Sequence, residues 1–149
     1  ATIRSTAPYD KFTTFNFAIH KELFTSIFFN TEITQYGYED TLLGKELEKR
    51  NANILHIDNP LLHNGIEDNA TYLSKVEQSI KTLISIKEEI ASTPLLDCAA
   101  KLQRYHLAGL FLFLWKATQK QMKRSLLGKN PSLKILNIYK LGFFLKHSR

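Results

Sequence analysis

The acidic residues of this chain are confined to its first part. All 14 of them lie at or before Asp97, and 11 lysine and arginine residues follow that position. The net charge of +6 is therefore the sum of an acidic first part and a wholly basic C-terminal section. Such an asymmetry indicates two regions that serve different partners.

The clearest boundary in the sequence is the run Ser92-Thr93-Pro94. Thr93 can cap a helix, and Pro94 suits the first helical position because its missing N–H would be unpaired there anyway. A helical pattern is expected from this point to about Leu127, and a further short helix is expected at residues 132–145. We therefore predict two domains, residues 1–93 and residues 94–149.

Composition sets the class of protein. A chain of 149 residues with 44% apolar residues can form a globular domain with a real core. The single cysteine, Cys98, excludes an internal disulfide framework and a cysteine-rich zinc site. The first ten residues contain neither an initiating methionine nor the apolar core of a signal peptide, so we expect a fragment that lacks an N-terminal portion.

The first region alternates strand-like and helix-like patterns. Strand content is predicted at residues 11–20 and 53–58, with a further extended piece at 61–63. Helices are predicted over residues 21–27, behind Glu39-Asp40, and from about residue 70 to residue 91. This order predicts a mixed α/β unit.

The stretch that leads into Glu39-Asp40 carries the strongest local signal. Acidic residues are favoured in the first turn of a helix, because they face unpaired N–H groups and the positive end of the helix dipole. Capping alone would explain one carboxylate. Tyr36-Gly37-Tyr38 in front of the pair suggests a tight turn beside an aromatic stacking surface. A capping role and a functional role for the pair both remain open on this reasoning.

Three motifs occur in a family's order in the first half of the chain. They read FNFAI at residues 15–19, YGYEDT at 36–41 and NPLLHNGIEDN at 59–69. Together they resemble the C-terminal half of a bacterial family 2 glycosyltransferase with a GT-A fold. The resemblance implies an α/β fold, followed here by a mainly helical basic region. It also implies a hexosyltransferase-like enzyme in cell-surface polysaccharide synthesis, which transfers a sugar with inversion from a nucleotide-sugar donor to a glycan or lipid-linked acceptor.

The resemblance also implies roles for single residues. Asp40 is the expected catalytic base that removes the proton of the acceptor hydroxyl, and Glu39 is expected to orient the acceptor, Asp40 or the backbone. Asn16, Tyr36 and Tyr38 are the expected acceptor-binding residues. A purely structural role is the alternative for Asn16, because an amide in a strand must find hydrogen-bond partners.

A divalent metal, Mn or Mg, is the expected cofactor, because the leaving diphosphate must be neutralised. His63 lies in the segment His63-Asn64-Gly65-Ile66-Glu67 and is the expected metal ligand of this chain. The alternative is a histidine that is satisfied by backbone groups. The sequence contains no Asp-any-Asp motif, so most of the ligands are expected in the missing N-terminal half.

The basic region suggests a second kind of partner. Residues 110–115 are entirely apolar but too few for a spanning helix, and lysines and an arginine follow at 116–124. A buried core is one reading; the other is an amphipathic surface for anionic lipids, which we prefer to nucleic acid because apolar bulk is interleaved with the charge. We expect a cytoplasmic protein at the inner face of the membrane. The alternative function is a non-catalytic helical module that binds anionic membranes or nucleic acid.

Overall fold

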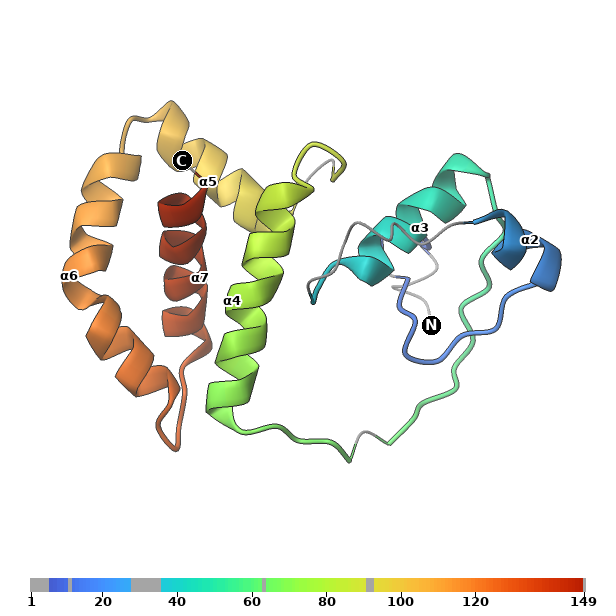
Figure 1. Cartoon of the computed structure of the whole chain (residues 1–149), viewed down its shortest axis with the longest axis horizontal. Helices are drawn as coiled ribbons and strands as arrows, with labels where there is room; N and C mark the ends of the chain where they lie inside the picture. The colour runs from blue at the N-terminus through green and yellow to red at the C-terminus, as the bar shows by residue number, and fades with distance from the viewer. Residues whose placement is uncertain (1–5, 11, 28–35, 63, 91–92, 149) are drawn as a thin grey trace. The chain divides into compact units, whose positions relative to one another are not determined.

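The computed structural model describes residues 6–10, 12–27, 36–62, 64–90 and 93–148. The chain divides into two compact units, residues 1–66 and residues 67–149. The helices of the described ranges are α2 (Lys21–Ser26), α3 (Glu39–Lys49), α4 (Asn69–Ser85), α5 (Pro94–Arg104), α6 (Ala108–Leu126) and α7 (Leu133–His147) (Figure 1).

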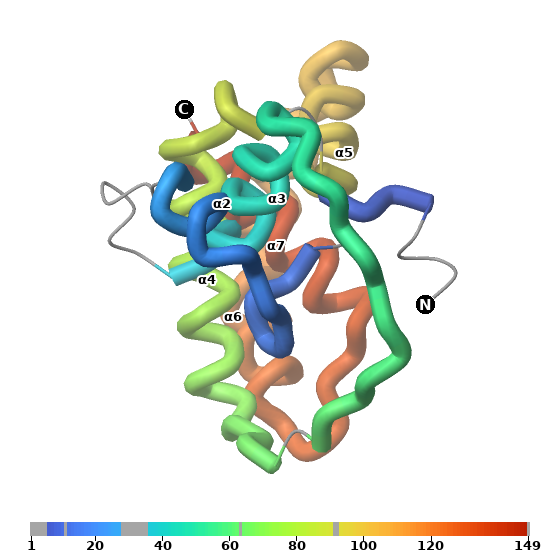
Figure 2. Tube along the Cα trace, turned by 90° about the vertical axis from the view of Figure 1, so that its right-hand side faces the viewer, coloured from blue at the N-terminus to red at the C-terminus, as the bar shows by residue number. Residues whose placement is uncertain are grey.

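The expected α/β fold, and with it the GT-A architecture, is wrong for the residues that the structure describes, which are helical and contain no strand. The segment 53–62 is drawn as a continuous trace between α3 and α4 (Figure 2). Its burial still alternates, since Ile54 and His56 are half-buried whereas Leu55 is 84% exposed and Ile57 68% exposed. A period of two specifies which side chains face inward, but a strand also needs a neighbour for its backbone, and among the described residues none pairs with it.

In the first unit, α3 forms where the sequence predicts a helix. It begins at Glu39, and it ends before Asn51, which adopts the left-handed conformation with φ 51°. Leu43 and Leu47 form a buried cluster with Ile27 and Ala52. A Cβ at Gly44 would lie 2.4 Å from the carbonyl oxygen of Tyr9, so only glycine lets the N-terminal segment pass this close to α3.

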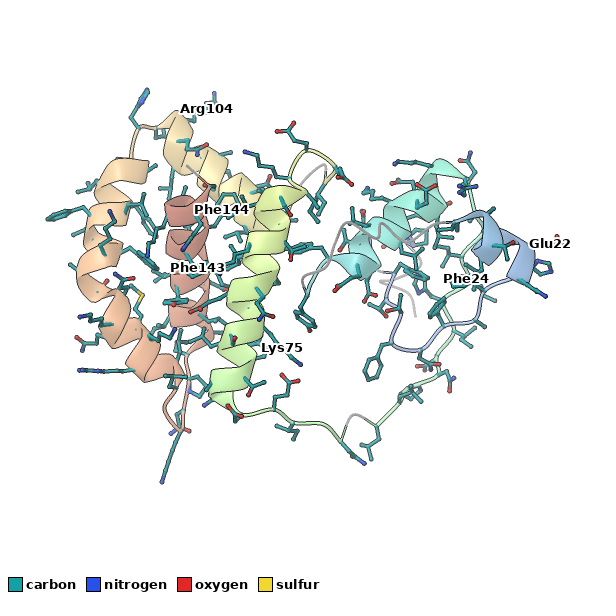
Figure 3. The ribbon with its side chains drawn as sticks, viewed as in Figure 1. Glu22, Phe24, Lys75, Arg104, Phe143 and Phe144 are labelled. Atoms are coloured by element: carbon teal, nitrogen blue, oxygen red, sulfur yellow. The ribbon has the colours of Figure 1, made fainter. Side chains whose placement is uncertain are left out.

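The second unit is a helical bundle around α7. This helix packs against α4, α5 and α6 and lies between α4 and α6 (Figure 1). Its residues 141–145 are all buried, including Phe143 and Phe144, which Figure 3 labels. A Cβ at Gly142 would lie within 2.3 Å of three ring atoms of Trp115, so glycine allows the α6 indole to pack directly on the α7 backbone. The packed residues are thus supplied by helices far apart in sequence.

The local start signals of this unit are confirmed. Thr93 accepts a hydrogen bond from the backbone N–H of Leu96 at 3.2 Å, and Pro94 follows at the first turn of α5. The expected continuous helix from Pro94 to Leu127 is wrong, because residues 105–107 separate α5 from α6. His106 adopts φ 57° there, a left-handed conformation that ends a helix.

The division of the chain differs from the expected one. The compact units divide between Ile66 and Glu67, and α4 packs on α7 in the second unit. A division at residues 93 and 94 assigned α4 to the first region. The functional separation of residues 1–93 from residues 94–149 stays a prediction, because packing alone does not test which partners each part serves.

Candidate functional site

The backbone turns sharply just before α3. Gly37 has φ 111° and Tyr38 has φ 72°, a left-handed conformation that a tyrosine rarely adopts and that costs about 1–2 kcal/mol. The backbone N–H of Gly37 donates to Glu39 Oε1 at 2.8 Å. The Glu39 side chain therefore folds back on the turn and holds it, which offsets part of that cost.

Tyr38 and Tyr36 flank this turn with different exposure. Tyr38 is half-buried, and burial raises the pKa of its phenol above the ordinary value. Its hydroxyl can act as a hydrogen-bond donor. Tyr36 is 53% exposed.

Asp40 is held by a residue that is distant in sequence. Thr14 donates twice to Asp40 Oδ1, from its backbone N–H at 3.1 Å and from its hydroxyl at 2.5 Å. The Asp40 side chain is half-buried, and its second oxygen, Oδ2, accepts no hydrogen bond from any residue that the structure describes. One carboxylate oxygen is thus anchored, while the other has lone pairs left for an incoming donor.

Asn16 links the same segment to the third motif. Its side-chain amide donates to the backbone carbonyl of Asn59 at 3.2 Å, and the residue is otherwise exposed. Thr14 therefore contacts the Asp40 carboxylate of the second motif, and Asn16 contacts Asn59 at the start of the third motif. The structure brings together one residue from, or next to, each of the three motifs that the sequence analysis singled out.

The predicted metal centre is not supported by a donor set. His63 lies outside the described residues. Among the residues that are described, no group of three or more histidine, cysteine, aspartate or glutamate side chains is arranged to hold a metal ion. A Mn or Mg site needs several oxygen ligands, so the expected cofactor stays a prediction whose ligands would lie outside the described residues.

The second acidic pair, Glu67-Asp68, has a local structural role. Asp68 Oδ1 accepts from the backbone N–H groups of Ala70 at 2.8 Å and Thr71 at 2.9 Å, which caps α4. Hydrogen bonds from Thr71, chiefly from its backbone N–H and next from its hydroxyl, lower the pKa of the Asp68 carboxyl. Glu67 pairs with Lys75. Both carboxylates thus have partners within their own element, and the pair does not compete with Glu39-Asp40.

Thr14 is the residue that the sequence analysis missed. Its hydroxyl holds Asp40 across 26 residues of chain. A weak signal was present, because Thr13-Thr14 directly precedes the first motif and a threonine next to a functional segment can supply a donor. Nothing in that pattern identifies the carboxylate that receives the bond.

Comparison with known proteins adds no assignment. No family model, curated protein or solved structure was found to match the chain. The functional argument therefore rests on the geometry around Asp40 and on the motifs themselves.

Proposed function

We propose that this chain is the acceptor-side, catalytic-base part of an inverting glycosyltransferase of the family 2 type. The enzyme transfers a sugar from a nucleotide-sugar donor to a glycan or lipid-linked acceptor in cell-surface polysaccharide synthesis. The observation that carries the proposal is the meeting of the three motifs at residues 14–16, through the Thr14–Asp40 and Asn16–Asn59 hydrogen bonds. The proposal concerns the reaction and the site, and it does not depend on a sheet in this part of the chain.

Asp40 has the geometry that a general base requires. Thr14 fixes Oδ1, and Oδ2 remains able to accept the proton of an acceptor hydroxyl. As that proton passes to Oδ2, the acceptor oxygen bonds to the anomeric carbon, and the bond from that carbon to the diphosphate oxygen breaks on the opposite face. The nucleoside diphosphate leaves with the electron pair. Proton removal by a positioned carboxylate is typically worth about 10²–10⁴-fold in rate.

The neighbouring residues position this base and the acceptor. Glu39 holds the turn through the N–H of Gly37, so it keeps Asp40 at the start of α3. Asn16 connects the segment that anchors Asp40 to the third motif. The exposed rings of Tyr36 and Phe15 offer flat apolar surfaces on which a sugar ring can stack, and Tyr38 supplies a protonated hydroxyl.

Binding of the nucleotide-sugar donor is assigned to other parts of the enzyme. The chain has no Asp-any-Asp motif, and the described residues hold no metal-binding group, so we assign the nucleotide and any Mn or Mg to other parts of the enzyme. The nucleotide-sugar donor and the metal both stay predictions. The contribution of this chain is to place the acceptor and to remove its proton.

The test compares two carboxylate variants of the polypeptide as the cell makes it. Release of nucleoside diphosphate is measured with a panel of nucleotide sugars and glycan acceptors. Asp40→Asn keeps the shape of the side chain but removes the base, and it should lower the transfer rate by about 10²–10⁴-fold while nucleotide binding persists. Glu67→Gln is the matched control, because Glu67 pairs only locally with Lys75, and it should leave the rate within about twofold.

Two results would contradict the proposal. Undiminished transfer by the Asp40→Asn variant would remove Asp40 from the chemistry. Absence of transfer and of nucleotide-sugar binding across the panel would remove the reaction class. The second result would leave the carboxylate pair with capping alone as its explanation.

A further inference from the structure

The outward side of α6 carries a cluster of exposed apolar side chains. Leu112 and Trp115 are buried, which fixes the inward side of the helix. Residues about half a turn away point outward, because the helix repeats every 3.6 residues. The exposed members of this cluster, called the apolar ridge below, are Leu110 (59%), Phe113 (71%) and Leu114 (56%), together with Tyr105 (67%) and Leu107 (47%) in the turn before α6.

The ridge differs from the other exposed apolar residues of the second unit. A single exposed leucine is ordinary on a protein surface and needs no explanation. Leu110, Phe113 and Leu114 instead follow the spacing of helix neighbours, so their side chains form one continuous patch. Leu133, at 76% exposure, lies at the start of α7, well separated in sequence from the ridge. A contiguous apolar patch on a small domain marks an interaction surface.

Exposed cations surround the ridge. Lys101 and Arg104 lie in the last turn of α5, and Figure 3 labels Arg104 where α5 leads into the turn before α6. Lys116 and Lys120 lie on α6. Among the described residues none of these four forms an ion pair, whereas Lys123 on the same helix pairs with Glu77 at 3.0 Å. No acidic residue follows Asp97, so nothing later in this sequence balances the four cations.

We propose that the apolar ridge and these four cations form a docking surface for an anionic lipid bilayer. The ridge enters the boundary between headgroups and acyl chains, and the cations bind lipid phosphates. No helix in the described part of the chain is long and apolar enough to cross a membrane, so the contact is with one surface of the bilayer.

Charge and apolar bulk together select this occupant. A second copy of the chain would set four cations against four cations across the same contact, which is unfavourable. A nucleic acid would satisfy the cations, but its phosphates and sugars would not cover the side chains of the ridge. An anionic bilayer satisfies both, because its headgroups carry the negative charge and its acyl chains receive the apolar groups.

The first experiment measures binding of the full chain to vesicles by flotation. Vesicles of phosphatidylcholine are compared with vesicles that contain about 30% phosphatidylglycerol, and we expect binding only to the latter, weakening with added salt. The double variant Leu110→Ser/Phe113→Ser should bind at least about tenfold more weakly. The double variant Lys116→Gln/Lys120→Gln should bind about 25-fold more weakly, at about fivefold per charge.

Two controls match these changes away from the ridge. Leu133→Ser removes an equally exposed leucine, and Lys81→Gln/Lys87→Gln removes the same net charge from exposed positions in or just after α4. Leu133→Ser should change vesicle binding by no more than about twofold. The double lysine control should change it by no more than about threefold. Loss of binding in the controls equal to that in the ridge variants would place the contact elsewhere and overturn the proposal.

The second experiment does not depend on losing an interaction. Trp115 is the only tryptophan of the chain and is 2% exposed, so it gives a constant background. A new tryptophan from Phe113→Trp should shift to the blue on anionic vesicles and be quenched by lipids brominated on their acyl chains. One from Leu133→Trp should do neither. Equal behaviour of the two variants would exclude insertion of the ridge.

Other molecules that could bind the apolar ridge would give distinct results in these experiments. Binding of a duplex DNA that displaces the chain from vesicles, with no blue shift of the Phe113→Trp variant, would identify a nucleic-acid surface. A dimer in sedimentation equilibrium that Leu110→Ser/Phe113→Ser converts to a monomer would identify a second copy. Both results, and absence of vesicle binding, overturn the proposal. The vesicle assay contains no sugar substrate, so its outcome is independent of the glycosyltransferase test.

Discussion

The two compact units are held together by different kinds of contact. The second unit is built from long amphipathic helices around α7, with Trp115, Tyr139 and Phe144 nearly inaccessible to solvent. The first unit has a small cluster of buried residues, and hydrogen bonds such as Thr14–Asp40 connect its N-terminal segment to α3. The candidate catalytic side chains thus lie where apolar packing is thinnest. Polar contacts there hold groups in place without burying them, as a site that must receive a substrate requires.

The largest effect should follow from removing a core side chain of the second unit. Leu83 is 0% exposed, so Leu83→Ala leaves a cavity and should lower the free energy of unfolding by about 3 kcal/mol. Urea unfolding followed by Trp115 fluorescence measures it, because that indole lies in the second unit. Leu47→Ala in the first unit is the comparison, and it should leave this transition nearly unchanged. An equal shift for both variants would mean that the two units unfold as one.

A smaller effect should follow from adding an atom where α6 meets α7. Gly142→Ala places a Cβ within 2.3 Å of three ring atoms of Trp115, so the helices must separate, at a cost of about 2 kcal/mol. Gly109→Ala is the matched control, since a Cβ there meets nothing within 4 Å and the alanine favours the helix by about 0.5–1 kcal/mol. The same fluorescence assay should show opposite signs for the two variants. Two shifts of the same sign would refute this account of the contact.

In the first unit the matching prediction concerns a hydrogen bond. Thr14→Val removes the hydroxyl that donates to Asp40 Oδ1 and should weaken the start of α3 by about 1 kcal/mol. Amide hydrogen exchange in the first turns of α3 should accelerate about fivefold, while exchange in α7 stays unchanged. Thr13→Val is the control, because Thr13 is exposed. No acceleration in Thr14→Val would show that Thr14 acts through its backbone N–H rather than its hydroxyl, and equal acceleration in both variants would show an effect unrelated to the lost hydrogen bond.

The smallest effect should be a change in acid sensitivity. Hydrogen bonds from Thr71 and Ala70 lower the folded-state pKa of Asp68, so its stabilising contribution is complete above the unfolded-chain value of 3.8. That contribution is lost as the pH falls through the lower folded-state pKa. Asp68→Asn still caps α4 but does not titrate, so its stability should fall less between about pH 5 and about pH 2 than that of the unaltered chain. Identical pH profiles by Trp115 fluorescence would exclude this role.

Sequence patterns predicted the local features of the fold with most success. The starts of α4 and α5 follow from caps that act within a few residues, and α3 starts at the Glu39-Asp40 pair. The break at His106 was missed, since no glycine or proline marks the 105–107 turn. A strand was predicted at 53–58 from a short apolar run, and burial there does alternate, but alternation carries no information about a pairing partner.

The candidate site shows the same limit. The sequence identified Glu39, Asp40 and Asn16 through their motifs. It did not identify Thr14, because the Thr14–Asp40 bond closes 26 residues of chain whose path no local signal describes.

The sequence by itself determined where α3, α4, α5 and α7 begin, and that the charge beyond Asp97 is wholly positive. The tertiary structure decided which apolar residues are covered. Within residues 110–115, all apolar, Leu112 and Trp115 are buried against the bundle, whereas Leu110, Phe113 and Leu114 stay exposed. The physical reason is that a helix presents one side to its partner, and the partner's position depends on long-range packing that no window of sequence contains.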